Sequence, residues 1–109
     1  MLEKKTTVDD VLKKIVDVIT RDFQPDKIIL FGSVARGDNT PESDYDICVI
    51  KEGVKYRREL TQEIYKSLCG TSASVDVIVE TPERFDELKD NPYLIYKNIS
   101  EEGKLLYEK

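Results

Sequence analysis

Two aspartates separated by one residue, Asp44 and Asp46, open a stretch that otherwise reads as a buried strand, and a third, Asp76, stands between valines in a later apolar run. Taken singly, each could be an exposed edge charge. Strand interiors are depleted in Asp, however, and an unpaired carboxylate between buried strands is costly. A divalent cation resolves that cost, because Mg²⁺ takes carboxylate oxygens, and two such ions can clamp the attacking and leaving oxygens of a displacement at phosphorus.

A Gly-Ser pair, Gly32 and Ser33, follows the first apolar run of strand character. Glycine lets the backbone approach a ligand closely, and amides at the start of a helical turn favour an anion. Ser33 adds a hydroxyl group. Ten residues separate this pair from the Asp-x-Asp pair. The whole pattern, with the later strand aspartate, therefore predicts a phosphate-binding turn beside a carboxylate site.

Alternating apolar residues predict the strands that must position these groups, at residues 27–31, 44–50 and 75–80, with a short final strand or tail at 105–107. Alternation places Asp44 and Asp46 on the face that also carries Cys48 and Ile50, roughly 6–7 Å apart along the strand. The third strand is expected to be buried, with Asp76 in its middle.

Helical spacing predicts helices around these strands. The first ends near Asp22, and Thr6 and Thr7 ahead of it resemble a capping box. A helical turn at residues 33–36 ends at Gly37. Later helices are predicted at residues 60–68, opening at Thr81–Glu83, and opening at Asn91–Pro92. The order of elements predicts a small sheet flanked by helices, an α+β fold.

Composition narrows the functional classes. The 109 residues, 1–109, are expected to form one domain. A net charge of −5 argues against nucleic-acid binding by bulk electrostatics, and the absence of histidine excludes zinc sites with His ligands and His-based catalysis. Cys48 and Cys69 are expected to be buried free thiols rather than a disulfide. Without a signal peptide, a membrane-length apolar run or a lipidation motif, we expect a cytoplasmic protein that binds no membrane.

These motifs resemble the signature of the nucleotidyltransferase superfamily related to DNA polymerase β, and within it the minimal nucleotidyltransferases (MNT proteins). The residues that carry the resemblance are Gly32-Ser33, Ala35-Arg36-Gly37, Ser43-Asp44-x-Asp46 and Asp76. The resemblance implies the nucleotidyltransferase fold, with a mixed sheet and the acids on one side of a cleft.

The same resemblance implies roles for the site residues. Asp44 and Asp46 would hold two Mg²⁺ ions, and Asp76 would ligate the catalytic metal and help to deprotonate the acceptor hydroxyl. Gly32 and Ser33 would cradle the triphosphate of ATP. Arg36 could pair with a phosphate, or could form a structural ion pair with Asp38 or Glu42.

Many minimal nucleotidyltransferases are antitoxins encoded beside a HEPN-domain ribonuclease toxin, and they transfer AMP from ATP to tyrosine hydroxyls of that toxin. The resemblance therefore implies an Mg²⁺-dependent nucleotidyltransferase that acts as an antitoxin. Two alternatives stay open: neutralisation of the toxin by binding alone, and transfer to a small-molecule hydroxyl. No segment here is long enough for the acceptor-holding helical domain of larger relatives, which favours a partner protein. Tyr93, Tyr96 and Tyr107 could contact that partner or could simply cover the small core.

Overall fold

The computed structural model of the chain describes residues 8–71 and 73–109. Its elements in chain order are α1 (Val8–Phe23), β1 (Lys27–Phe31), α2 (Gly32–Arg36), β2 (Tyr45–Ile50), α3 (Arg57–Leu68), the 3₁₀ turn η1 (Cys69–Thr71), β3 (Val75–Glu80), α4 (Pro82–Leu88), α5 (Ile95–Glu102) and β4 (Lys104–Glu108). Residues 104–108 therefore form a strand rather than a tail. The predicted capping residues Thr6 and Thr7 lie outside the described residues.

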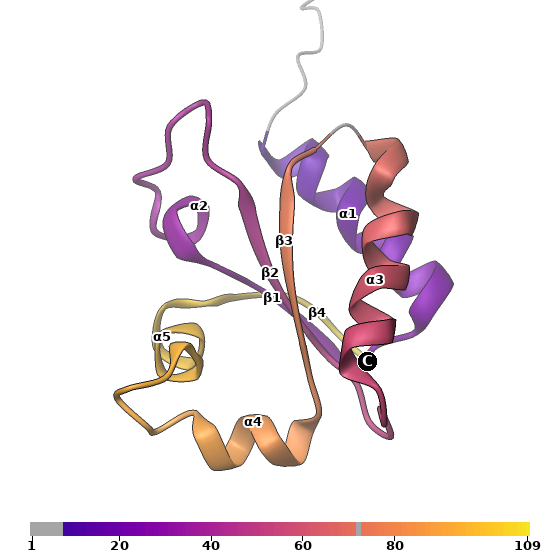
Figure 1. Cartoon of the computed structure of the whole chain (residues 1–109). Helices are drawn as coiled ribbons and strands as arrows, with labels where there is room; N and C mark the ends of the chain where they lie inside the picture. The colour runs from indigo at the N-terminus through magenta and orange to yellow at the C-terminus, as the bar shows by residue number, and fades with distance from the viewer. Residues whose placement is uncertain (1–7, 72) are drawn as a thin grey trace, which may run out of the picture.

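The four strands form one mixed sheet in the order β3-β2-β1-β4. The strand β1 pairs antiparallel with both β2 and β4, whereas β2 and β3 are parallel. Helices α1 and α3 lie on one face of the sheet, and α2, α4 and α5 lie on the other (Figure 1). This three-layer arrangement confirms the predicted α+β fold with a mixed sheet flanked by helices.

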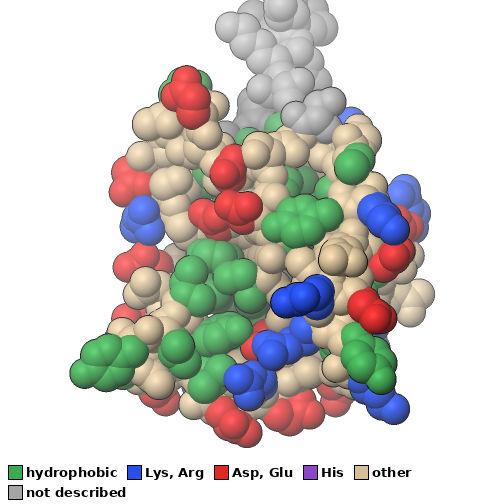
Figure 2. Space-filling model, in the orientation of Figure 1, with side chains coloured by type: hydrophobic (Ala, Val, Ile, Leu, Met, Phe, Trp, Pro, Cys, Tyr) green, Lys and Arg blue, Asp and Glu red, His purple; other side chains and the backbone are tan. Residues whose placement is uncertain are grey.

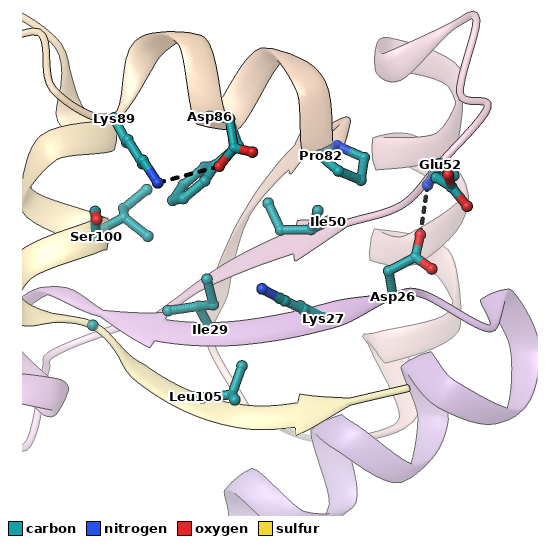
Figure 3. Close-up of a pocket in the computed structure, with 13 residues that line it drawn as sticks. Asp26, Lys27, Ile29, Ile50, Glu52, Pro82, Asp86, Lys89, Ser100 and Leu105 are labelled. Atoms are coloured by element: carbon teal, nitrogen blue, oxygen red, sulfur yellow. Dashed lines mark hydrogen bonds and ion pairs between the residues drawn. The ribbon is translucent and has the colours of Figure 1, made fainter.

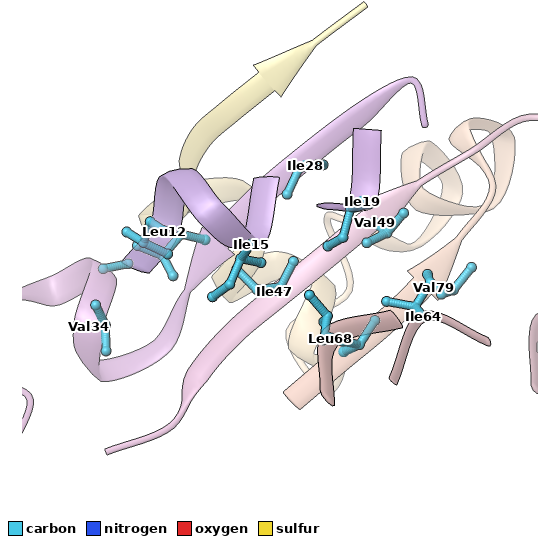
Figure 4. Packing of buried hydrophobic residues seen from close by; sticks show 13 residues of the cluster. Leu12, Ile15, Ile19, Ile28, Val34, Ile47, Val49, Ile64, Leu68 and Val79 are labelled. Atoms are coloured by element: carbon cyan, nitrogen blue, oxygen red, sulfur yellow. The ribbon is translucent and has the colours of Figure 1, made fainter. Parts of the chain in front are cut away.

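The main hydrophobic core lies between the sheet and the pair α1 and α3. Figure 4 shows Ile15 and Ile19 of α1 reaching the sheet beside Ile47 and Val49 of β2, and these four side chains are fully buried. Ile64 of α3 is buried with them. Alternation along β2 sends Asp46, Cys48 and Ile50 to the opposite face, as the sequence predicts, whereas Tyr45 packs with Ile47 and Val49.

A second, smaller core fills the face covered by α4 and α5. It contains Phe31, Cys48, Ile50 and Ile99. Burial raises the pKa of the Cys48 thiol to about 12, so this thiol stays protonated at neutral pH and acts as a small apolar group. Both cysteines are free thiols as predicted, but Cys69 is exposed, because it lies in the turn after α3 rather than on its buried side.

The start of α5 differs from the sequence-based expectation. The helix begins at Ile95, not at Asn91–Pro92. The Asn91 side chain accepts a hydrogen bond from the Tyr93 N–H at 2.9 Å, and the Asn91 carbonyl accepts one from the Leu94 N–H at 3.2 Å. These bonds close a turn, and Asn competes in this way with helix formation. No helix of the described residues is long and apolar enough to cross a membrane.

A fully buried carboxylate, Glu80, ties four elements together at the end of β3. Its Oε1 accepts hydrogen bonds from Arg57 of α3 at 2.7 Å and from the Tyr96 hydroxyl of α5 at 2.6 Å. Its Oε2 accepts the Thr81 N–H at 3.1 Å, and Arg84 of α4 lies 3.7 Å from Oε1. Burial and the bond to Glu80 raise the pKa of Tyr96 to about 12. Glu80 is thus buried and well paired, the condition under which a buried charge is tolerated.

We expect Glu80→Ala to lower the free energy of unfolding by about 1–3 kcal/mol, because the Tyr96 hydroxyl loses its hydrogen-bond acceptor, whereas Arg57 and Arg84 are about half exposed and remain solvated. Urea denaturation followed by circular dichroism measures this loss. The matched control is Glu87→Ala on the exposed side of α4, which should change the stability by about 0.5 kcal/mol or less. Equal losses in the two variants would contradict a structural role for the Glu80 network.

Candidate active site

The parallel pairing of β2 with β3 brings the predicted acids together at the end of the sheet where both strands begin. In this register Asp46 lies directly beside Asp76, and Phe31 lies on the other side of Asp46. Asp44 lies one residue before β2 rather than within it. The Ser74 hydroxyl donates a hydrogen bond to the Asp44 carboxylate, and the Tyr45 N–H donates to the Ser74 carbonyl at 2.9 Å. Asp46 and Asp76 therefore share a sheet face, and Asp44 adjoins them.

The environment of Asp76 differs from the expectation of a buried mid-strand carboxylate. The strand β3 is an edge strand of the sheet, and Asp76 is its second residue and is exposed. Its two valine neighbours pack toward the α1 and α3 side, which explains the apolar pattern around it. The sequence-based argument from burial cost was therefore wrong for Asp76.

The pKa of the Asp46 carboxyl group is raised in the folded chain. Burial raises the pKa of its carboxyl group, the negative charges of Asp76 and then of Asp44 raise it further, and the positive charge of Arg36 opposes them. Asp76, Asp44 and Arg36 therefore each lie within electrostatic range of Asp46. A cation placed among the carboxylates would reverse the repulsion between them.

Gly32 fits against Asp46 because it has no side chain. Its backbone has φ +77°, and a Cβ atom built on it would lie 2.1 Å from Asp46 Oδ2. Here the chain turns directly from β1 into α2, with Ser33 partly buried at the next position. Gly37, with φ +85°, ends α2 as predicted, and its N–H donates to the carbonyls of Ser33 and Val34. The Gly-Ser turn thus places its backbone next to Asp46, the carboxylate whose pKa is raised.

Arg36 forms structural ion pairs, which is one of its two predicted roles. Its guanidinium lies 3.2 Å from Asp38 and 3.6 Å from Glu102 of α5. The Asp38 pair agrees with the sequence-based alternative, whereas the second partner is Glu102 rather than Glu42. Arg36 therefore links α2 to α5 at the rim of the acidic site.

Sequence reasoning missed Tyr65, which stabilises the free edge of β3. The Val77 N–H donates a hydrogen bond to the Tyr65 hydroxyl at 2.8 Å. An edge strand otherwise leaves such groups unpaired, and this one follows Asp76 directly. Tyr65 follows Ile64 on α3, and nothing in the helical pattern marks it as reaching the sheet edge.

The three carboxylates suit Mg²⁺, because this ion prefers oxygen ligands and its positive charge offsets the repulsion between them. As they stand, however, no three Asp, Glu, Cys or His side chains of residues 8–71 and 73–109 converge as a ready-made metal site. Ligation of a shared ion would require side-chain rotation, and Asp44 would exchange its bond from Ser74 for a metal bond. The acids thus fit a metal site that forms on binding.

A cavity lies elsewhere on the same face. It has a volume of about 480 Å³ between the sheet and the helices α4 and α5, and it contains none of the three acids. Figure 3 shows Ile29, Ile50 and Leu105 on the sheet side, with the Lys89–Asp86 ion pair on α4. A hollow of about 650 Å³ adjoins Asp44 and is lined by residues 39–45 and Ser74, among others. The acidic site is therefore open to solvent, with Asp76 exposed and Asp44 and Asp46 partly exposed, and Figure 2 shows acidic side chains at the surface of this face.

Comparison with known proteins agrees with this geometry. The nucleotidyltransferase domain family matches residues 12–106. A Methanocaldococcus jannaschii protein named "putative protein adenylyltransferase" is 39% identical over 82 residues, which cover 74% of this chain and 77% of that protein. A second protein of that organism and description is 36% identical over 67 residues, covering 62% of this chain and 66% of that protein.

Solved structures share the fold. A "putative nucleotidyltransferase" of Sulfolobus solfataricus superposes with a TM-score of 0.67 at 21% identity, over 100% of this chain and 93% of that one. A toxin–antitoxin structure with AMP-PNP gives a TM-score of 0.61 at 24% identity, over 89% of this chain and 73% of that one. A mutant of the toxin–antitoxin pair MntA–HpeT gives 0.60 at 22% identity, over 89% and 73%.

Replacing Asp46 with Asn should raise the melting temperature at pH 7 in the presence of a chelator, because it removes a charge that the folded state disfavours. The raised pKa favours protonated Asp46 in the folded chain. Protonated Asp46 therefore contributes to stability at a pH below about 3.9, the pKa of Asp in the unfolded chain. This contribution is lost as the pH rises through the higher pKa of Asp46 in the folded chain. The gain in the variant should vanish near about pH 3.

Differential scanning calorimetry across this pH range measures the effect. Asp90→Asn, on an exposed turn, is the control and should leave the melting temperature nearly unchanged at both pH values. A lower melting temperature for the Asp46 variant at pH 7 would instead mark this carboxylate as structural.

Gly32→Ala should turn the Asp46 carboxylate away from Asp76, because the new Cβ takes its place. Gly53→Ala is a matched control: its φ of +75° imposes similar backbone strain, roughly 1–2 kcal/mol, but no atom lies within 4 Å of its Cβ. Carboxyl NMR titration should show the Asp46 pKa falling toward its usual value only in the Gly32 variant. An unchanged Asp46 pKa there would show that Gly32 does not set the position of this carboxylate.

Proposed function

This chain belongs to the nucleotidyltransferase domain family, and we propose that it transfers AMP from ATP to a hydroxyl group of a partner protein, as an antitoxin that modifies its toxin. The observation that carries the proposal is the in-register pair of Asp46 and Asp76 beside the Gly32 backbone. The names of the archaeal relatives support protein as the acceptor, and the toxin–antitoxin structures of the same fold support a toxin partner. A HEPN-domain toxin with an acceptor tyrosine is the specific form of this proposal.

In this proposal Asp44, Asp46 and Asp76 hold Mg²⁺, as two ions. Bound there, Mg²⁺ would neutralise charge on the phosphates and would favour ionisation of the acceptor hydroxyl. The fit rests on the electrostatics of Asp46, whose pKa is raised by burial and by the other two carboxylates. The repulsion between the carboxylates favours binding of a cation, and it destabilises the folded chain when no cation is bound.

The remaining residues orient the nucleotide and receive a proton. Gly32 and Ser33 bind the β- and γ-phosphates through backbone N–H groups and the Ser33 hydroxyl. The acceptor oxygen forms a bond to the α-phosphorus, the bond from that phosphorus to the bridging oxygen breaks, and pyrophosphate leaves. Asp76 accepts the hydroxyl proton, and its exposed position at the sheet edge lets an acceptor from outside reach it. Arg36, held by Asp38 and Glu102, stays at the rim.

Neutralisation by binding alone is the second candidate, and exposed apolar residues favour it. Tyr93 is 92% exposed, and Leu94 and Ile95 beside it at the start of α5 are exposed as well. Tyr96 and Tyr107, by contrast, pack against the two cores. A partner that covers residues 93–95 would lie on the same face as the acids, so binding and transfer could operate together.

Incubation of the chain with ATP, Mg²⁺ and the protein encoded beside it should add the mass of one or more AMP groups to that protein. Intact-mass spectrometry detects the adduct, and peptide mapping gives the acceptor residue. Asp46→Asn should reduce the rate by about 10²–10³, since one charge that stabilises the transition state is lost.

Asp90→Asn, away from the site, is the control and should modify the partner at the wild-type rate. Tight binding of the partner without any adduct would contradict the enzymatic proposal and would support neutralisation by binding.

A further inference from the structure

We propose that Arg57 and Arg84 form an anion-binding site that recognises an acidic side chain of the acceptor protein, close in sequence to the acceptor hydroxyl. This inference rests on the proposed function and adds a determinant of acceptor specificity to it. Both guanidinium groups are anchored on the buried carboxylate of Glu80, Arg57 by a hydrogen bond of 2.7 Å and Arg84 by an ion pair of 3.7 Å.

The two arginines keep an uncompensated positive charge. One carboxylate neutralises only one of them, and no other carboxylate of the described residues lies within 4 Å of either guanidinium. Their side chains remain 45% and 53% exposed, whereas the Glu80 side chain is fully buried. A guanidinium has five N–H donors in a planar fork. Glu80 takes one N–H of Arg57 and lies 3.7 Å from Nε of Arg84, so both half-exposed groups keep donors for a second carboxylate.

The arginine site and the acids share one strand face. Asp76, Ile78 and Glu80 alternate along β3, so the anchor of the arginines lies four residues from Asp76, roughly 13 Å along the strand. Half-buried Ile78 separates them. In Figure 2 the acidic side chains, an apolar surface and a group of basic side chains follow one another down this face. A bound molecule could therefore contact both charged regions across an apolar strip.

The acceptor, rather than the nucleotide, supplies the anion at this site. The Gly32-Ser33 turn that is proposed to bind the triphosphate follows β1, on the opposite side of Asp46 from β3. The phosphates would therefore extend away from the arginines, and the nucleoside carries no charge. An extended peptide covers about 13 Å in four residues. The geometry thus suits an acidic residue about four positions from the acceptor tyrosine. In a chain of net charge −5, this local pair sets specificity rather than long-range attraction.

The test uses two synthetic peptides that each contain one tyrosine and differ only in Glu or Gln four residues after it. With ATP and Mg²⁺, the Glu peptide should be modified with about tenfold higher kcat/KM, mainly through a lower KM. Arg84→Gln should reduce this preference to about twofold or less. Arg84 is the residue of choice because it is only ion-paired, so its loss leaves the hydrogen bonds of Glu80 in place.

Lys13→Gln, which removes an exposed positive charge from α1 on the other side of the sheet, should retain the full preference. Fluorescence anisotropy of the labelled peptides without ATP separates this inference from the proposed function. Tighter, Arg84-dependent binding of the Glu peptide supports the arginine site even where no AMP is transferred. Equal affinity for the two peptides, or a preference that Arg84→Gln leaves intact, would overturn it.

Discussion

The in-register pairing of β2 with β3 is the constraint on which the site depends. Parallel neighbouring strands begin at the same end of the sheet. The second residues of both strands, Asp46 and Asp76, are therefore side by side on one face. An antiparallel pairing would place Asp76 toward the opposite end of the sheet, and a shift by one residue would send one of the two acids to the α1 and α3 side, since side chains alternate between faces. The hydrophobic packing of Ile47 and Val49 against α1 excludes that shift. The core thus fixes the position of the two acids relative to each other.

Carboxylates on this face are stabilised in two different ways. Glu80, at the far end of β3, is fully buried and is satisfied within the chain by Arg57, Arg84, Tyr96 and the Thr81 N–H. Asp46, at the near end of β2, is only partly buried and lies near two other carboxylates, whose effect the positive charge of Arg36 opposes. The first arrangement holds β3, α3 and α5 together. The second is incomplete within the chain, which is the property expected of a site that binds a cation.

Much of this could be predicted from the sequence, because local patterns decide it. Alternation along residues 45–50 indicated the correct faces, and glycine in a strand-to-helix turn indicated a close approach, which Gly32 makes to Asp46. The errors at the site concern sheet order and long-range partners. An apolar run such as residues 75–80 does not show whether it is central or at an edge, so Asp76 was expected to be buried. Contacts between distant segments involve Tyr65, Glu102 and the Glu80 network. The periodicity of the sequence does not indicate such contacts.

The edge position of β3 also has a functional consequence. A central strand would bury Asp76 and raise the cost of its charge, but it would shield the carboxylate from any acceptor arriving from another protein. At the edge, Asp76 is solvated and accessible, and the Tyr65 hydroxyl occupies the Val77 N–H that an edge leaves free. That bond blocks one of the groups by which a foreign strand could add to the sheet. The edge position thereby leaves Asp76 accessible, while the Tyr65 bond limits strand pairing at the same edge.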